Sequence, residues 1–586
     1  MNHRLRPTLG IMGLATLVVS CGPDQSSPDD HRSTGGSVST GGSGAVESTG
    51  GAGSNTGGLG PGGTGGTGPG GTGGAGVGGS GGFSTGGFAT GGVGSESGGV
   101  ATGGVGIGGT GAGGTGGFGA GGSSGASGAS DTGGAPPATR PALVTSGEGS
   151  YWQQGELTET SASNATVTVN ENNELQEWTG FGGTFNEAGW DALAELSPSD
   201  LDRAIRLLFD ANDGANFVWG RIPIGASDYA MSRYTLAETP NDYAMEHFSI
   251  DRDRQRLIPY IQAALEVKPN LRLWATPWSP PAWMKDSNNV DGTDAGSTFV
   301  SHMLSDPQIL EAYALYFARF VEEYATVGIH IEQVQPQNEP GYQTRYPSCL
   351  WDSGLLGRFV GDYLGPTLES RGLDTEIWFG TLSNDQTYSG QIQGLTGAAA
   401  RYTVGVGLQW NTRPNVQTLA NRGFLIMQTE HKCGNYPWEG GFNPDRPPND
   451  HAYALESWGL IRDWINAGVH AYSAWNMVLD TVGQNLDEAR AWPQNALLTV
   501  NRATDTLTAT PAYYVFRHLS YFVDPGAVRL GTTGGDALAF RNPDGSIVTV
   551  LHNAGGQPTQ TTLAVGGTTV QFQVPARGWA TVHWNG

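Results

Sequence analysis

Two glutamates lie where short apolar runs end, and their positions suggest acid–base or nucleophilic chemistry. Glu339 closes a segment that begins at Ile331, whose alternating apolar residues predict a short strand stopped by prolines. Glu430 closes the apolar run Gly423–Thr429 in the same way. When two strands project one carboxylate each into a common cavity, the pair can act as the acid and the nucleophile of a glycosidase. These two glutamates are therefore the candidate catalytic residues.

Further polar and aromatic side chains stand near other expected strand ends. Aromatic rings pack against the C–H face of a sugar, while carboxylates and amides bind its hydroxyl groups. The segment Ala275–Lys285 contains three prolines and two tryptophans, which predict a rigid aromatic wall. The candidates beside the two glutamates are Arg221, Asp228, Trp278, Asn338, Trp475 and Asn495.

The segments that must position these residues alternate between strands and helices. Helices are indicated by a capping pattern at Ser197–Asp200 and by apolar residues at helical spacing in Glu311–Tyr324 and Ala452–Ile465. Eight strands with helices between them predict an α/β fold, a (β/α)8 TIM barrel, with a doubly wound open sheet as the alternative. We expect these strands near residues 178–184, 216–224, 271–276, 331–337, 376–380, 402–410, 423–429 and 469–476.

The alternation of strand and helix patterns ends on both sides of the expected barrel, which we assign to residues 178–507. After Pro511, short strands with hairpin signals such as Asn542–Gly545 predict a β-sandwich over residues 508–586. Residues 143–177 include the strand pattern Thr166–Val169. We therefore expect them to contribute to the same side β-domain.

The N-terminus has the features of an export signal. Residues 1–20 carry two arginines and then an apolar run that is too short to span a bilayer as a mature helix. The small residues before Cys21 match the lipobox of bacterial lipoproteins, in which the cysteine becomes the lipidated N-terminus. An ordinary secretory signal with a chance cysteine is the alternative. We expect an exported protein, either lipid-anchored to the cell envelope at the outer membrane or cell surface, or secreted.

Residues 21–142 predict a disordered, Gly-rich tether behind this lipid anchor. Between Gly35 and Gly134 lie 49 of the chain's 95 glycines. Such a segment buries too little apolar surface to offset the entropy of ordering it, and its glycines hold no collagen-like frame. A Gly-rich chain of about 120 residues spans on the order of 60 Å, so the folded part can sweep the surface around its anchor.

Composition and missing motifs narrow the function further. A formal net charge of −24 argues against nucleic acid as a partner. The sequence has no His-Glu-x-x-His or Cys-x-x-Cys ligand spacing, so we expect neither a metal nor a cofactor. No Gly-x-Ser-x-Gly elbow stands at an expected strand-to-helix turn, which argues against an esterase. The expected partner is a β-linked oligosaccharide or polysaccharide or a glycolipid, bound by a monomer.

Taken in order, the segments resemble glycoside hydrolase family 30, which includes lysosomal glucosylceramidase and bacterial and fungal endo-glycanases. The resemblance implies a (β/α)8 barrel with a side β-domain built from both ends of the catalytic region. It implies Glu339 as general acid/base and Glu430 as nucleophile of a retaining enzyme, with Arg221 in support. The sugar subsite would be lined by Asp228, Trp278, Asn338, Trp475 and Asn495. The matching segments are Gly180–Gly183, Arg221–Asp228, Thr276–Lys285, Gln337–Pro340, Thr429–Glu430 and Trp475–Asn476.

One segment departs from this family pattern. Gln409-Trp410-Asn411 stands where glucosylceramidase-like members place a histidine and a tyrosine around a tryptophan. We expect Gln409 at the sugar, and the substitution argues against glucosylceramide as the substrate. β-1,6-glucan, β-1,6-galactan and xylan are the alternatives. A second class of function is a surface carbohydrate-binding protein without activity, although a pure binder needs neither catalytic glutamate.

Two cysteines remain besides Cys21. Cys433 follows the proposed nucleophile by three residues, and Cys349 follows the proposed acid/base by ten. Both are therefore expected in loops at the barrel mouth, and an exported location favours oxidation. Ten extended residues span more than about 30 Å, so reach does not prevent pairing. We predict a disulfide between them, with two buried free thiols as the alternative.

Overall fold

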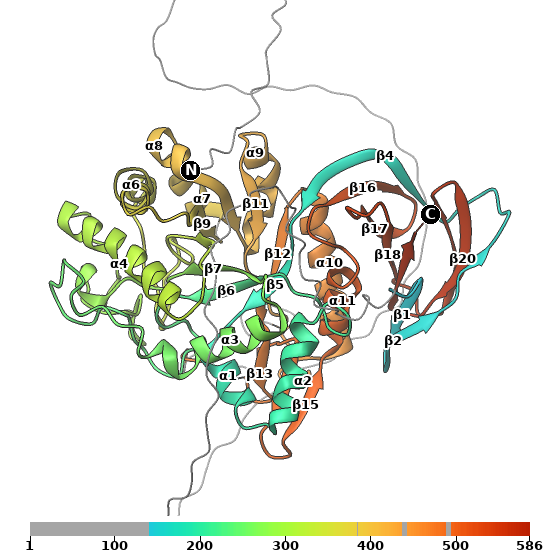
Figure 1. Cartoon of the computed structure of the whole chain (residues 1–586), viewed down its shortest axis with the longest axis horizontal. Coiled ribbons are helices and arrows are strands. Elements are labelled where there is room, and N and C mark those ends of the chain that lie inside the picture. The colour runs from blue at the N-terminus through green and yellow to red at the C-terminus, as the bar shows by residue number, and fades with distance from the viewer. Residues whose placement is uncertain (1–139, 384, 436–441, 484, 488–493, 586) are drawn as a thin grey trace, which may run out of the picture. The chain divides into compact units, whose positions relative to one another are not determined.

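A computed structural model describes residues 140–585, apart from residues 384, 436–441, 484 and 488–493 (Figure 1). The expected signal peptide, Cys21 and nearly all of the expected tether lie outside the described residues. Among the described helices, none combines the length and the apolar character needed to cross a bilayer.

Eight parallel strands close into a barrel, in which each strand pairs with its sequence neighbour and the last pairs with the first. All eight strands expected from the sequence are present, so the open-sheet alternative is wrong. The closing pair is set by the register of Ala471 with Gly180. In chain order the strands are β5 (Gly180–Thr184), β6 (Trp219–Pro223), β7 (Arg272–Thr276), β8 (Gln333–Val334), β9 (Glu376–Leu382), β10 (Thr403–Leu408), β11 (Leu425–Gln428) and β12 (Ala471–Asn476).

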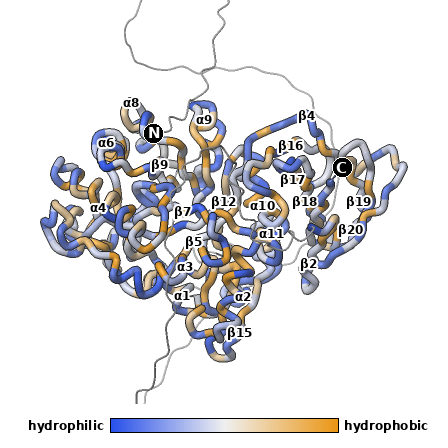
Figure 2. The backbone as a smooth tube through the Cα atoms, in the orientation of Figure 1, coloured by the Kyte–Doolittle hydropathy of each residue, from blue (hydrophilic) through white to orange (hydrophobic). Residues whose placement is uncertain are grey.

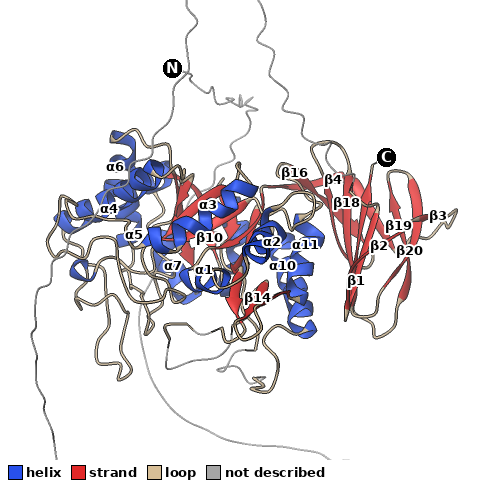
Figure 3. Ribbon diagram, turned by 60° about the horizontal axis from the view of Figure 1, so that its bottom comes forward, coloured by secondary structure: helices blue, strands red, loops and turns tan. Residues whose placement is uncertain are grey.

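Helices surround these strands (Figure 3). The predicted start of α2 is confirmed, because Ser197 Oγ accepts a hydrogen bond from the Asp200 amide and Pro198 occupies the first turn. The helices are α1 (Glu187–Leu193), α2 (Pro198–Phe209), α3 (Leu257–Val267), α4 (Pro307–Thr326), α5 (Leu355–Arg358), α6 (Gly365–Ser370), α7 (Asp385–Gln393), α8 (Gly397–Tyr402), α9 (Val416–Ala420), α10 (His451–Ala467) and α11 (Pro511–Ser520).

The first barrel strand is rich in glycine because its neighbours leave no room for side chains. A Cβ atom at Gly182 would lie 2.1 Å from the carbonyl oxygen of Trp219 in β6, and one at Gly183 would lie 2.3 Å from the Met477 side chain. The absence of side chains therefore lets β5 pack tightly against β6 and against the end of β12.

A ten-stranded sheet forms the side domain, and it draws strands from both ends of the described chain. The long strand β4 (Val167–Trp178) pairs antiparallel with β16 (Ala527–Thr533) and leads directly into the barrel. The sheet's other strands are β1 (Leu143–Gly147), β2 (Ser150–Gly155), β3 (Thr158–Glu159), β17 (Asp536–Arg541), β18 (Ile547–Asn553), β19 (Thr559–Val565), β20 (Thr568–Val574) and β21 (Gly578–Trp584).

Helices α10 and α11 lie between the barrel and this sheet (Figure 1). Trp458 and Arg462 of α10 both donate hydrogen bonds to the Asp536 carboxylate in β17, each at 3.0 Å. Figure 2 shows hydrophobic segments concentrated around the barrel strands. A smaller sheet of β13 (Val478–Asp480), β14 (Leu498–Asn501) and β15 (Thr506–Ala509) follows the last barrel strand. The chain thus combines a TIM barrel with a β-sandwich side domain.

Candidate active site

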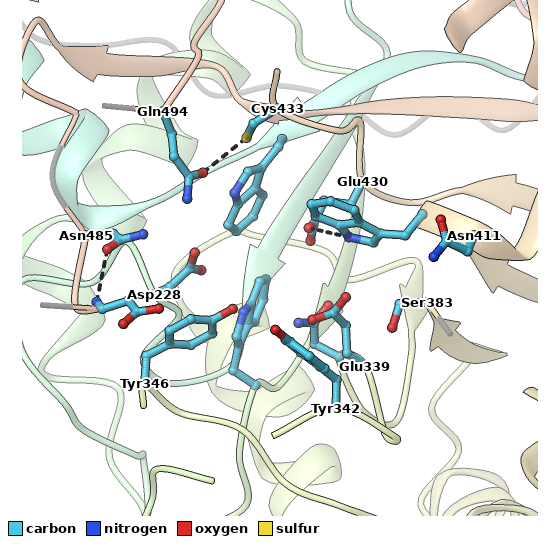
Figure 4. A pocket seen from close by; sticks show the side chains of 15 residues that line it. Asp228, Glu339, Tyr342, Tyr346, Ser383, Asn411, Glu430, Cys433, Asn485 and Gln494 are labelled. Carbon is cyan, nitrogen blue, oxygen red and sulfur yellow. Dashed lines mark hydrogen bonds between the residues drawn. The ribbon is translucent and has the colours of Figure 1, made fainter. Parts of the chain in front are cut away.

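One cavity of about 230 Å³ opens at the carboxyl end of the barrel strands (Figure 4). Both candidate glutamates line it, Glu339 in the loop after β8 and Glu430 in the loop after β11. Of the other candidates from the sequence, the cavity is lined by Asp228, Trp278, Asn338 and Trp475. Strand ends from all around the barrel therefore place these side chains together, as the sequence predicted.

Arg221 of β6 is the fully buried cation beneath this cavity. Its two terminal nitrogens donate to Glu430 Oε2 and to Asn338 Oδ1, each at 2.6 Å. The guanidinium carbon also lies 4.4 Å from the ring centroid of Trp278 and 5.4 Å from that of Trp475. Burial lowers the pKa of Arg221, while the Glu430 charge opposes that shift. Arg221 thus holds the nucleophile candidate and the Asn338 amide in fixed positions.

Glu430 receives a hydrogen bond on each carboxylate oxygen. Arg221 bonds Oε2, and Trp410 donates from Nε1 to Oε1 at 3.2 Å. The Asn338 amide oxygen accepts a second bond from Thr381 Oγ1 at 3.0 Å. Because both of these bonds go to Oδ1, they fix the amide of Asn338, a residue that lines the cavity, and leave its NH2 group available to a ligand.

Glu339 is in a different environment. Burial, followed by the negative charge of Glu430, raises the pKa of Glu339 to about 7. Gln409 donates to Glu339 Oε1 at 3.2 Å, and Ser383 supplies a second donor, so both partly oppose the shift. Glu430 is thus paired with the Arg221 cation, whereas the raised pKa of Glu339 favours its protonated form up to about neutral pH. This is the division of roles that a glycosidase needs.

Backbone strain is present at two residues that line the cavity. Glu339 has φ +49° and Trp410 has φ +52°, a region that residues with a Cβ atom adopt infrequently. The Glu339 amide is held by a hydrogen bond to the Thr381 carbonyl at 3.0 Å. Strain of this kind persists only where surrounding contacts over-determine the conformation, and it is concentrated at functional sites.

Asp228 and a tryptophan pair form the buried end of the cavity. Burial, with a further contribution from the Glu430 charge, raises the pKa of Asp228 well above its usual range. Its Oδ1 atom is buried and has no hydrogen-bond partner in the described part of the chain. Trp278 and Trp475 stack with ring centroids 5.5 Å apart and planes 21° apart. This end offers a polar atom and aromatic surface to a ligand.

Two sequence candidates do not line the cavity. The Gln409 side chain is fully buried and joins Glu339 to Thr429, whose hydroxyl donates to Gln409 Oε1 at 2.8 Å. Asn495 uses its Oδ1 atom to accept from the Gly434 amide at 2.9 Å, so it supports the loop after Glu430. Neither side chain lines this cavity, and each makes a structural contact, so the expectation that these two residues contact the sugar stays a prediction.

Several lining residues were missed by the sequence reasoning. Two tyrosines follow Glu339 closely in the chain, and Trp410 and Asn411 belong to the segment that departs from the family pattern. The positions of these four residues in the sequence could have indicated that they lie at the cavity. The loop after β13, in contrast, carries no sequence pattern that points to it. The residues missed are Tyr342, Tyr346, Ser383, Trp410, Asn411, Asn485, Asp487 and Gln494.

The predicted disulfide is wrong. Cys349 and Cys433 are both free and buried. Cys349 packs in the main hydrophobic core, whereas Cys433 lines the cavity and donates from Sγ to Gln494 Oε1 at 3.1 Å. Burial raises the pKa of the Cys349 thiol to about 12. The two loops start from the same barrel end, but they turn their cysteines into separate environments.

Comparison with known proteins agrees with this site. The model of the glycosyl hydrolase family 30 TIM-barrel domain matches residues 178–523, and that of the family 30 beta sandwich domain matches residues 526–582. The chain belongs to glycoside hydrolase family 30. It is therefore a glycoside hydrolase, and its barrel and side domain are those of the family.

The names of relatives in this family refer to different substrates. The chain is 28% identical to putative glucosylceramidase 1 of Caenorhabditis elegans over 66% of this chain and 76% of that protein. It is 26% identical to endo-1,6-beta-D-glucanase neg1 of Aspergillus fumigatus over 68% of this chain and 83% of that protein. Among solved structures, SrfJ from Salmonella typhimurium shares the fold with a TM-score of 0.67 and 23% identity, covering 76% of this chain and 99% of that one.

Proposed function

We propose that this family 30 hydrolase cleaves β-glucosidic bonds with retention of configuration. The observation that carries the proposal is the pair of carboxyl groups in one cavity with unlike surroundings. Glu430 is ion-paired with Arg221 and bonded by Trp410, whereas Glu339 has a pKa raised to about 7. An ionised nucleophile and a protonated acid can therefore coexist at neutral pH.

The chemistry follows as a double displacement. A Glu430 oxygen attacks the anomeric carbon, the bond from that carbon to the leaving oxygen breaks, and Glu339 gives its proton to that oxygen. Glu339, now ionised, takes a proton from water, and the resulting hydroxide oxygen displaces Glu430 from the anomeric carbon. The Asn338 NH2 group is positioned to donate to the sugar 2-hydroxyl, a contact that strengthens in the transition state.

β-Glucose is the glycone we propose. The names of the relatives, glucosylceramidase and endo-1,6-beta-D-glucanase, share a β-linked glucosyl unit and differ in the group that leaves. The buried end of the cavity suits one sugar ring, because Trp278 and Trp475 supply aromatic surface and the unpartnered Asp228 Oδ1 can accept or share a hydroxyl proton.

The stereochemical course tests this proposal. Hydrolysis of β-D-glucosyl fluoride and of β-glucan fragments should give β-glucose as the first product in an early proton NMR spectrum, and Glu430→Gln should abolish release. First-formed α-glucose would overturn retention. Absence of hydrolysis of any β-glucoside by the unsubstituted protein would instead favour a carbohydrate-binding protein without activity.

We also propose that the protein is exported and lipidated at Cys21. The support is the N-terminal signal pattern and the small residues before that cysteine. Cys21→Ala should move the protein from the membrane fraction to the soluble fraction of the cells that make it. Unchanged membrane association would rule out this anchor.

A further inference from the structure

Two different donors bind the carboxylate of Glu430. The indole Nε1 of Trp410 donates to Oε1 at 3.2 Å, and the guanidinium of Arg221 donates to Oε2 at 2.6 Å. Figure 4 marks the indole bond at Glu430 with a dashed line. Trp410 lines the cavity, whereas Arg221 is fully buried beneath it. The neutral donor is therefore the one at the cavity surface.

The backbone of Trp410 is fixed on both sides. Its φ of +52° belongs to a region that residues with a Cβ atom adopt infrequently. The Gln409 amide before it donates to the Leu382 carbonyl at 2.9 Å. The Asn411 amide after it donates to the Ser383 carbonyl at 3.2 Å. These bonds to the end of β9 and to the residue after it hold the strained backbone, so the indole N–H keeps its direction toward the nucleophile.

A cation lies over the indole ring. The Lys432 ammonium is 5.5 Å from the ring centroid of Trp410, within the range of a cation–π interaction. The backbone at Lys432 is also held, because its carbonyl accepts from the Tyr453 hydroxyl at 3.0 Å. A cation over the ring attracts its π electrons and makes the ring N–H a stronger donor. The loop that carries Glu430 thus also stabilises the tryptophan that bonds Glu430.

The two steps of a double displacement change the charge of Glu430 in opposite directions. In the first step, its carboxylate loses its charge as it bonds the anomeric carbon. In the second step, a water oxygen attacks that carbon, Glu339 takes a proton from the water, and the electron pair of the breaking bond returns to Glu430. A hydrogen-bond donor stabilises the ionised carboxylate more than the ester. Such a donor therefore speeds the second step and does not speed the first.

We propose that the Trp410 indole N–H is a catalytic donor for the second step, the release of the sugar from Glu430, and that Lys432 is the positioning residue that holds the indole in place. The proposal rests on the proposed role of Glu430 as nucleophile. Without the indole donor, Arg221 still binds Glu430 and keeps it ionised. The first step should then proceed at nearly its usual rate, while the second step loses part of the stabilisation of its developing charge.

One reagent measures the two steps separately. 2-Deoxy-2-fluoro-β-D-glucosyl fluoride transfers its sugar to the nucleophile, so the rate of inactivation follows the first step. After the excess reagent is removed, the return of activity follows the second step. Trp410→Phe keeps an aromatic ring but removes the donor. Its rate constant for reactivation should fall by about tenfold, while its rate constant for inactivation should fall by less than about threefold.

Three further variants complete the test. Lys432→Met removes the cation and should lower the rate constant for reactivation by about threefold, whereas Lys432→Arg keeps a cation and should retain most of that rate. Trp458→Phe is the matched control, because it also removes an indole donor from a carboxylate, that of Asp536 in the side domain. It should leave both rate constants unchanged. If Trp410→Phe does not fold, the two Lys432 variants decide the test.

The pattern of losses decides the role of Trp410. Slower reactivation without an equal loss in inactivation, in Trp410→Phe but not in Trp458→Phe, supports the proposal. Equal losses in the two steps, a loss confined to inactivation, or unchanged reactivation in Trp410→Phe or Lys432→Met would overturn it. If the unsubstituted protein hydrolyses β-glucosides but carries no label at Glu430, the nucleophile assignment fails. If it hydrolyses no β-glucoside, the proposed function fails. The role of Trp410 falls in both cases.

Discussion

Glu339→Gln should stabilise the folded protein while it removes activity, and the gain should grow with pH. Burial and the Glu430 charge raise the pKa of Glu339 to about 7, compared with 4.5 for an ordinary glutamate. The native state therefore binds more protons than the unfolded chain between these values. Stability must fall as the pH rises through this interval, and the loss is complete above the native pKa.

The magnitude follows from the size of the shift. At roughly 1.4 kcal/mol per pKa unit, ionising Glu339 lowers the free energy of unfolding by about 1 kcal/mol at pH 5.5 and about 3 kcal/mol at pH 8.5. Glutamine carries no charge at either pH, and its Oε1 can still accept from Gln409. The variant should therefore gain about 2 kcal/mol more at pH 8.5 than at pH 5.5.

Urea unfolding followed by tryptophan fluorescence measures this difference, with wild type and variant compared at both pH values. Comparing the two pH values removes any pH-independent effect that the glutamine side chain has on the free energy of unfolding. Glu311→Gln, on the exposed face of α4, controls for removing one negative charge from an acidic chain. A gain that is equal at the two pH values, or larger at pH 5.5, would refute the reasoning about Glu339.

Three other predictions concern the same site. Arg221→Met should lower the free energy of unfolding by about 3–5 kcal/mol at neutral pH, because Glu430 loses its buried cation; a urea-unfolding loss below about 1 kcal/mol would contradict this. Gln409→Leu removes a donor to the ionised form of Glu339, so the high-pH limb of kcat/KM, expected near pH 7, should move to higher pH; a shift to lower pH would show that Gln409 acts otherwise. The two cysteines of the described chain should both react with a thiol reagent after denaturation without reductant, and reductant should leave the melting temperature unchanged.

The barrel could be predicted from the sequence because its signals are local. Each strand is a short apolar run with its own stop, and the choice of Glu339 and Glu430 as catalytic candidates needed only the rule that strand ends converge. Their separate roles came from the resemblance to the family. Strand limits were less exact, since β8 extends only from Gln333 to Val334, within an expected range of 331–337. A run of apolar residues predicts that a segment is buried, but it predicts less well where the hydrogen bonds to the neighbouring strand end.

The loop residues could not be predicted, because their positions depend on contacts between distant segments. Asn485 reaches the cavity because the neighbouring Leu486 amide bonds the Asp228 carbonyl at 2.7 Å, a pairing that no local pattern encodes. The disulfide prediction failed for a related reason. A loop that is long enough to bring two cysteines together does not determine which way each side chain points, and Cys349 turns into the hydrophobic core.

Trapping the covalent intermediate is the most direct test of the central claim that Glu430 is the nucleophile of a retaining β-glucosidase. The protein is incubated with 2-deoxy-2-fluoro-β-D-glucosyl fluoride, digested, and analysed by mass spectrometry. The account predicts one fluoroglucosyl adduct, on the peptide that contains Glu430, and none in Glu430→Gln. An adduct on Glu339, or no adduct from protein that hydrolyses β-D-glucosyl fluoride, would contradict it.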